Sequence, residues 1–278
     1  SLYCEYDFGN CKIIRCKDCG LAFRTNIPDI STLREIYNSE DYFKHSFFSD
    51  LKDQSRIASP HYKAYEKGIT EIREFLTGHN PKILDIGAST GFFLNLAKKN
   101  GFIPFGVEIS KKFCDYAKEV FGIEIFNGTV EEADFEENFF DCVTMWDLIE
   151  HLLNPMETIS TVSRILKKGG VLFIATPDEG SLLTSIGKLI YRLSGGVLSY
   201  SAKALHPDTH MYFFSRKTIR LLMKKYGFKL VHQYDGEALY KHSPLVTNFL
   251  YNCSISVIEK FALLMRKQYR MFIIAIKL

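Results

Sequence analysis

The sequence predicts an α/β protein built on a doubly wound, mostly parallel sheet. From residue 81 onward, short apolar segments of strand length alternate with segments whose apolar residues recur at helical spacing. Such alternation places parallel strands side by side through right-handed helical crossovers. The 278 residues, 46% hydrophobic and 24% charged, have the composition of a globular protein. The length suits one large domain with appendages, or two small domains.

Each element of the predicted sheet follows from this alternation. The expected strands are residues 82–86, 103–108, 122–126, 139–145, 171–176, 228–234 and 270–276. The expected helices are residues 91–99, 110–120, 155–168, 215–226 and 246–266. The alternation pauses only after the fifth strand, where an insertion interrupts it.

Three further regions complete the expected organisation. Residues 1–30 form a cysteine-rich segment and residues 31–77 form N-terminal helices, which leaves 78–278 as the main domain. The insertion, residues 180–210, is expected to be a helical cap packed on the sheet. Its amphipathic helix would carry an apolar face made of Leu183, Ile186, Ile190, Leu193 and Val197.

Charge and cysteine content limit the partners and the compartment. Lys and Arg number 35 and Asp and Glu 32, so the net charge of +3 is too small to require nucleic acid or an anionic membrane as partner. No basic stripe with interleaved aromatic residues is visible, which argues against nucleic acid. No apolar run approaches the roughly 18–20 residues of a membrane span, and no signal peptide pattern is present. Seven cysteines, an odd number, favour a reducing compartment, so we expect a cytoplasmic protein.

The turn after the first parallel strand is the strongest local signal. It reads Asp85-Ile-Gly87-Ala-Ser89-Thr-Gly91 and leads directly into a helix, whose free N–H groups favour an anionic ligand group. A dinucleotide fingerprint fails here, since Ser89 and Phe92 stand where glycines are needed, and no P-loop lysine follows. The loop therefore suits a ligand with an amino and a carboxylate group but no pyrophosphate. The alternative is a tight strand–helix turn without a ligand.

A second acid supports the ligand. Glu108 ends the second strand, in Gly-Val-Glu-Ile-Ser110, where a carboxylate can accept both hydroxyls of a ribose. The alternative is an ordinary surface glutamate. The spacing of Glu108 from the first loop favours the ribose interpretation.

These motifs carry a family resemblance. Residues 81–176 resemble the class I S-adenosylmethionine-dependent methyltransferases, and more closely the bacterial ones with a cysteine-rich, zinc-ribbon-like N-terminal segment. The matching segments, in order, are Ile-Leu-Asp85 to Leu94, Gly-Val-Glu108-Ile-Ser, Phe140 to Leu152, Arg164-Ile-Leu-Lys-Lys-Gly-Gly170, Ala175-Thr-Pro177-Asp, and His210-Met-Tyr-Phe-Phe-Ser215. The resemblance implies a Rossmann-like sheet of seven strands with the last antiparallel.

The resemblance also implies a cofactor site for S-adenosylmethionine, with S-adenosylhomocysteine as product. The methionine moiety would lie on Asp85, Gly87, Ala88, Ser89, Thr90 and Gly91. Glu108 would bind the ribose, Ile109 the adenine face, and Thr129 and Val130 the adenine edge. Trp146 and Asp147 would line the sulfonium and the substrate entrance.

Methyl transfer to a hydroxyl or an acidic C–H also needs a base, and histidine suits neutral pH. His151 and His210 are the candidates, although His151 could instead be a structural residue at a helix start. We expect a small-molecule acceptor, a sugar or a glycan or lipid-linked intermediate by family analogy, and no metal in the catalytic site. The alternative is a catalytically silent cofactor-binding or regulatory domain; a nicotinamide-dependent oxidoreductase is disfavoured by the failed fingerprint. The acceptor, the methylated atom and the oligomeric state stay open.

Two peripheral features have a sharper and a plainer interpretation. Cys16-Lys-Asp-Cys19 is half of a zinc ribbon, and Cys4 and Cys11 could complete a tetrahedral site, but we favour free thiols because the upstream Cys-x-x-Cys pair is absent. The cap helix carries lysine and arginine beside its apolar face, so peripheral contact with a membrane surface is the alternative to an ordinary packed helix.

Overall fold

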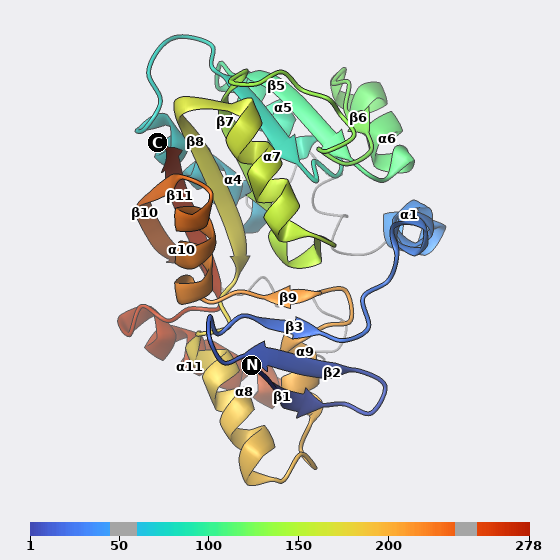
Figure 1. The fold of residues 1–278 in the computed structure, drawn as a ribbon, viewed down its shortest axis with the longest axis vertical. Helices are drawn as coiled ribbons and strands as arrows, with labels where there is room; N and C mark the ends of the chain where they lie inside the picture. Colours follow the sequence, from blue (N-terminus) through green and yellow to red (C-terminus); the bar gives the residue numbers. More distant parts are fainter. Residues whose placement is uncertain (45–59, 237–248) are drawn as a thin grey trace.

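The computed structural model describes residues 1–44, 60–236 and 249–278. Two sheets share these residues, a large one of seven strands and a small one of four. Figure 1 shows the large sheet with its helices in the upper part of the molecule and the small sheet below it. Among the described residues, no helix has the length and apolar character needed to cross a membrane.

The large sheet has the strand order β10-β11-β8-β7-β4-β5-β6. Its strands are β4 (Lys82–Ile86), β5 (Ile103–Glu108), β6 (Phe126–Asn127), β7 (Phe140–Trp146), β8 (Leu166–Pro177), β10 (Phe228–Gly236) and β11 (Arg270–Lys277). Strand β11 runs antiparallel to both of its neighbours, whereas β4 to β8 pair in parallel. The doubly wound sheet of seven strands with an antiparallel last strand is therefore confirmed.

Helices cover both faces of the large sheet, which is why its central strands are apolar on both sides. One buried cluster joins the sheet to α7 (Pro155–Ile165) and α10 (Arg216–Lys225), and a second joins it to α4 (Pro60–Arg73) and α5 (Phe92–Lys99). Helix α6 (Lys111–Phe121) flanks β5, and η1 (Ile149–His151) is one 3-10 turn after β7. The core thus lies in two layers around the sheet.

The small sheet has the order β1-β2-β3-β9. It combines β1 (Leu2–Asp7), β2 (Lys12–Cys16) and β3 (Ala22–Arg24) with β9 (Tyr212–Phe213), which lies much later in the chain, just before α10. Its core of Tyr6, Ile13 and Phe213 also contains Ala202 of α9 (Tyr200–Leu205). The N-terminal segment therefore packs with the inserted helices as one layer.

The inserted helix packs differently from the expected cap. Helix α8 (Leu182–Leu193) contacts α9 and α11 (Phe249–Leu264), and the Tyr191 hydroxyl lies 3.0 Å from the Asp7 backbone nitrogen. It lies against the small sheet rather than over the large one (Figure 1). Three residues of the predicted apolar face are exposed, since Ile190 is 36%, Leu193 80% and Val197 83% exposed.

Several predicted boundaries were wrong. The third strand begins at Phe126 because Gly122 adopts a left-handed conformation (φ 63°) and ends α6 there, so residues 122–125 are not strand. The fifth strand begins at Leu166, which pairs with Phe140 ahead of the left-handed Gly169, so helix α7 ends at Ile165. Of the expected final helix, residues 246–248 lie outside the described residues. The N-terminal helices include α1 (Ile30–Asn38) and α2 (Glu40–Phe43), which lead toward the site described below.

Candidate functional site

The glycine loop after β4 is shaped by left-handed backbone. Gly87 (φ 75°), Ser89 (φ 48°) and Gly91 (φ 74°) all adopt it, and Gly91 is the N-cap of α5. A Cβ on Gly91 would lie 2.7 Å from the Ala117 Cβ, and one on Gly87 would lie 2.8 Å from Leu148 Cδ1. Backbone conformation therefore favours glycine at both positions, and at Gly91 the Ala117 Cβ also leaves no space for a side chain. The loop delivers the N–H groups of α5 to the carboxyl end of the sheet.

Glu108 links the glycine loop to the neighbouring strand. Its Oε2 accepts a hydrogen bond from the Ser89 backbone N–H at 2.9 Å, and its Oε1 accepts one from the Ser110 N–H at 2.8 Å. The side chain is buried, which raises the pKa of the Glu108 carboxyl while these N–H donors oppose the shift. The carboxylate consequently faces the loop instead of solvent, as a ribose-binding acid would.

Asp85 is a buried acid at the end of β4. Its Oδ1 accepts a hydrogen bond of 2.6 Å from Thr144 Oγ1 on β7. Burial raises the pKa of Asp85 to about 8, with a smaller contribution from the nearby Glu108 carboxylate. Within the described ranges, Ser89 Oγ and Thr90 Oγ1 are buried without a hydrogen-bond partner. The loop thus combines a poised acid with polar atoms that a ligand could satisfy.

The last residues of α1 pack on the start of α6, close to Glu108, a contact that the sequence did not predict. Ser110 Oγ donates to the Tyr37 carbonyl at 2.7 Å, and the Lys111 N–H donates to Asn38 Oδ1 at 2.8 Å. The rings of Tyr37 and Tyr42 meet edge to face at 4.8 Å. Burial raises the pKa of Tyr37 to about 12, and the Glu108 carboxylate contributes to the shift. Sequence patterns could not predict these contacts, because they join segments about seventy residues apart.

The predicted adenine-binding residues lie beside Glu108, with one exception. Ile109 follows it and is half-buried, and the Gly128 N–H donates to the Glu108 carbonyl at 3.0 Å, which brings Thr129 close to the end of β5. Val130, by contrast, is buried in the core of the large sheet. The structure therefore brings together Asp85, Gly87 to Gly91, Glu108, Ile109 and Thr129, whereas the Val130 side chain is packed in the core.

Trp146 ends β7 and fills the core instead of an open pocket. Its ring centroid lies 4.5 Å from that of Phe173 and 4.7 Å from that of Tyr65. Gly68 on α4 makes room for it, since a Cβ there would lie 2.5 Å from the indole. Asp147, the next residue, has a left-handed backbone (φ 47°) and forms an ion pair with Arg270. Asp147 is thus held by Arg270 and Trp146 by the aromatic core, and their place at the cofactor and substrate entrance stays a prediction.

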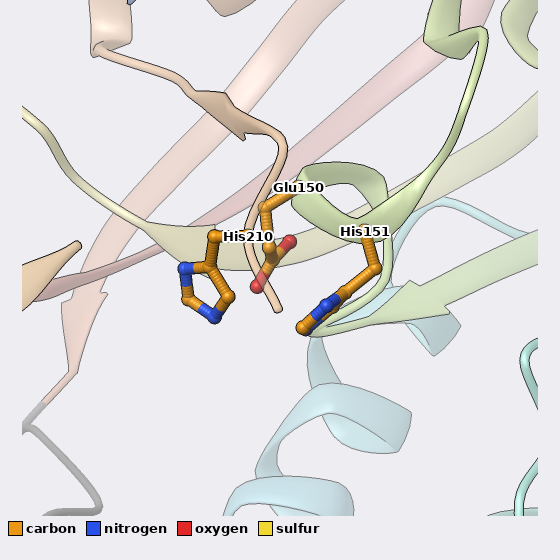
Figure 2. Close-up of side chains that lie close together, drawn as sticks. All are labelled: Glu150, His151 and His210. Atoms are coloured by element: carbon orange, nitrogen blue, oxygen red, sulfur yellow. The ribbon is translucent and has the colours of Figure 1, made fainter. Parts of the chain in front are cut away.

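Glu150, His151 and His210 form a compact cluster, here called the acid–histidine group (Figure 2). Each residue offers one atom that could bind a metal ion, a carboxylate oxygen of Glu150 or a ring nitrogen of a histidine. These three atoms lie within 4.8 Å of one another. The two imidazole rings are nearly perpendicular, with centroids 4.6 Å apart. Residues 150 and 151 come from η1, and His210 from the approach to β9, whose Met211 N–H donates to the Glu150 carbonyl at 2.8 Å.

The electrostatics of the acid–histidine group follow from its burial. Glu150 is 2% exposed, its Oε2 accepts a hydrogen bond of 2.8 Å from Thr176 Oγ1, and burial raises its pKa to about 8. Burial likewise lowers the pKa of both histidines, and the nearby His151 lowers that of His210 further. The sequence singled out both histidines but gave Glu150 no role, although its position in Glu-His directly after a strand was a usable signal.

The four N-terminal cysteines do not converge. Cys4 is exposed, Cys11 is buried in the core of the small sheet, Cys16 ends β2, and Cys19 lies in the turn after it. The backbone N–H of Cys19, followed by that of Asp18, lowers the pKa of the Cys16 thiol. Within residues 1–44, 60–236 and 249–278, the acid–histidine group is the only cluster of three or more metal-ligating side chains that meets the distance above.

Comparison with known proteins gives a consistent result. A family described as a methyltransferase domain matches residues 59–233. The chain is 27% identical over 161 residues to a ubiquinone biosynthesis O-methyltransferase of Coxiella burnetii, covering 54% of this chain and 68% of that protein. It is 31% identical over 158 residues to an uncharacterized protein of Methanocaldococcus jannaschii, covering 56% and 69%.

Solved structures share the fold. Magnesium protoporphyrin IX methyltransferase from Synechocystis PCC 6803, solved with bound S-adenosylhomocysteine, is 14% identical with a TM-score of 0.60, covering 90% of this chain and 100% of that one. A SAM-dependent methyltransferase from Archaeoglobus fulgidus is 20% identical with a TM-score of 0.50, also covering 90% and 100%. At these identities the likeness establishes the fold.

Proposed function

This chain belongs to the methyltransferase domain family and is an S-adenosylmethionine-dependent methyltransferase, and we propose that it methylates a hydroxyl oxygen of a small molecule bound beside His151 and His210. The observation that carries the proposal is the position of the acid–histidine group. It follows β7, the strand next to β4, and begins two residues after Leu148, whose side chain packs on Gly87 of the cofactor loop.

The residues of the loop fit the cofactor. An ammonium group would pair with Asp85, and a carboxylate would meet the N–H groups at the start of α5. Ribose hydroxyls would bind Glu108, and the adenine would lie between Ile109 and Thr129. The unpartnered hydroxyls of Ser89 and Thr90 support this fit, because buried polar atoms are normally satisfied.

S-adenosylmethionine supplies a methyl group already activated on a sulfonium. The protein must then hold the acceptor oxygen in line with it and assist the loss of the hydroxyl proton. His151 and His210 are the groups available for that task on the acceptor side. The similarity to an O-methyltransferase supports an oxygen acceptor, and two partly buried imidazoles suit a neutral hydroxyl better than a charged amine.

A sugar, glycan or lipid-linked intermediate remains our proposed acceptor class. The lipid-linked version draws support from the end of the inserted helix and the turn after it, where Leu193 and Val197 are exposed close to Arg192. Apolar side chains flanked by basic ones are typical of helices that lie on anionic membranes. For the N-terminal cysteines we keep the prediction of free thiols.

The test compares His210→Ala with the wild type and with His232→Ala. His232 is a matched control on β10, where its Nε2 lies 3.3 Å from Glu71 Oε2, away from the acid–histidine group. S-adenosylhomocysteine formation is followed over a panel of hydroxyl-bearing sugars, phenols and polyprenyl-linked glycans. Calorimetry then measures S-adenosylhomocysteine affinity, with NAD as the negative ligand.

We expect His210→Ala to lower turnover by about 100-fold, the lower range for loss of proton-transfer assistance, with little change in S-adenosylhomocysteine affinity. Equal losses of turnover and affinity would make His210 structural. Tight S-adenosylhomocysteine binding without turnover on any acceptor would instead favour the silent cofactor-binding domain.

A further inference from the structure

The acid–histidine group leaves a buried carboxylate oxygen without a partner. Glu150 is only 2% exposed. Its Oε1 atom is inaccessible to solvent and makes no hydrogen bond among the described residues. Figure 2 shows the carboxylate lying between the imidazole rings of His151 and His210. Burying a carboxyl oxygen without a partner is costly, most of all when the group is ionised, so such an oxygen is normally satisfied by a donor or a cation.

Two polar atoms of the group, on His151 and on Glu150, are oriented by neighbours outside it. His151 Nδ1 lies 2.8 Å from the Thr209 carbonyl oxygen, which can only accept, so Nδ1 carries the hydrogen and Nε2 presents its lone pair. Glu150 Oε2 is held by the Thr176 hydroxyl. Metal-binding histidines and carboxylates are characteristically oriented in this way by a second layer of hydrogen bonds.

The spacing and the donor types indicate which ions fit. Donors on one tetrahedral Zn²⁺ lie about 3.4 Å apart, since each bond is about 2.0–2.1 Å long. The three ligand atoms lie within 4.8 Å of one another, so small side-chain rotations would close them on one ion. Two imidazoles and one carboxylate favour Zn²⁺ or Fe²⁺ over Mg²⁺ or Ca²⁺, which prefer all-oxygen sites.

We infer that Glu150, His151 and His210 bind one divalent transition-metal cation, and that its open coordination position takes the hydroxyl oxygen of the methyl acceptor. Three protein ligands with one open position are typical of catalytic rather than structural sites. The inference rests on the proposed function for the identity of the acceptor. In this arrangement the two histidines do not take up the acceptor proton themselves. They hold the cation, and the cation promotes loss of that proton.

The chemical step balances without a further reactant. A hydroxyl on a divalent cation loses its proton to water more easily than a free hydroxyl does. The oxygen lone pair then forms the bond to the methyl carbon. The bond between that carbon and sulfur breaks, and its electron pair returns to sulfur, which leaves neutral S-adenosylhomocysteine and the methyl ether.

The decisive experiment measures Zn²⁺ binding to the full chain after chelator treatment, by competition with a chromophoric chelator. Cys16→Ser/Cys19→Ser serves as the background, so that thiols do not contribute. We expect one equivalent of Zn²⁺, and dissociation constants about 100-fold higher in Glu150→Gln and in His210→Ala, since loss of even an outer hydrogen bond costs 10–100-fold. His232→Ala should bind as the background does.

A second readout guards against misfolding. Gln at position 150 can still accept from the Thr176 hydroxyl, and S-adenosylhomocysteine affinity, measured by calorimetry, should be the same in all these variants. Co²⁺ substitution should give the visible absorption of nitrogen and oxygen ligation without thiolate charge transfer. Substoichiometric Zn²⁺ binding in the background protein, or undiminished binding in Glu150→Gln and His210→Ala, would overturn the inference.

Activity separates this inference from the proposed function. If Zn²⁺ binds as expected but no hydroxyl acceptor is methylated, the proposed function fails and the metal site stands. If the chelator-treated protein binds no Zn²⁺ and methylates its acceptor at the full rate, the inference of a metal site fails and the proposed function stands.

Discussion

Binding of S-adenosylhomocysteine should release a proton from Asp85. In the free protein this carboxyl is buried and its pKa is raised to about 8, so at pH 7 about 0.9 of the molecules carry the proton. An ammonium group placed against Asp85 favours the ionised form and lowers its pKa. Binding at pH 7 should therefore release close to one proton, and the affinity should rise about tenfold per pH unit between pH 6 and 7, then level off above pH 8.

Titration calorimetry in two buffers of different ionisation enthalpy measures this release directly. Asp85→Asn keeps the shape of the side chain and its contact with Thr144 Oγ1 but has no proton to lose, so its binding heat should become nearly buffer-independent. A buffer-independent heat in the wild type at pH 7 would refute the proposed contact between Asp85 and the ammonium group.

The same pKa shift predicts how stability depends on pH. The folded-state pKa of Asp85 lies above its ordinary value of 3.8, so the unfolded chain binds fewer protons than the folded one between these values. The contribution of Asp85 to stability is therefore complete below about pH 4 and is lost as the pH rises to about 8. Urea titrations of the free protein at pH 5 and pH 8 should show a smaller drop in Asp85→Asn than in the wild type.

Two further predictions concern the loop and the inserted helix. Gly91→Ala should lower the free energy of unfolding by about 2–3 kcal/mol, and Gly122→Ala by only about 1 kcal/mol. Both glycines have positive φ, but only Gly91 lacks space for a Cβ. Equal losses in urea denaturation would contradict the steric argument. Vesicles of anionic lipid should co-sediment the protein, and Leu193→Gln combined with Val197→Gln should weaken that binding about tenfold or more, since each residue is over three-quarters exposed and available for insertion; no sedimentation of the wild type would exclude the membrane contact.

The cofactor loop could be predicted from sequence because its signals are local. Asp85, Gly87 and Gly91 lie within seven residues at the end of one strand, and Glu108 ends the next strand. The carboxyl ends of adjacent parallel strands meet at one edge, so strand assignment alone was enough to place these groups together. The start of the third strand was predicted wrongly although its apolar residues alternate as expected. The left-handed Gly122 ends helix α6, so the residues directly after it connect the helix to the strand and do not belong to the strand.

The parts that sequence did not predict depend on pairing between distant segments. Strand β9 has two residues, too few for a periodic signal, and exists because Ala22 and Phe23 supply its hydrogen-bonding partners. The role of Tyr37 depends likewise on a bond from Ser110. The family resemblance implied a place for Trp146 at the entrance, and only the fold shows that its ring packs in an aromatic core beside Gly68. Local propensity carries no information on such contacts.

These distant pairings bear on the acceptor side as much as on the fold. The Met211 backbone lies between two partners, since its carbonyl accepts from the Arg24 N–H at 2.9 Å and its N–H donates to the Glu150 carbonyl at 2.8 Å. His210 is therefore held by the small sheet on one side and by the turn after β7 on the other. Because rigid support on both sides fixes where an imidazole can point, the cysteine-rich segment shapes the geometry of the acid–histidine group although none of its thiols belongs to that group.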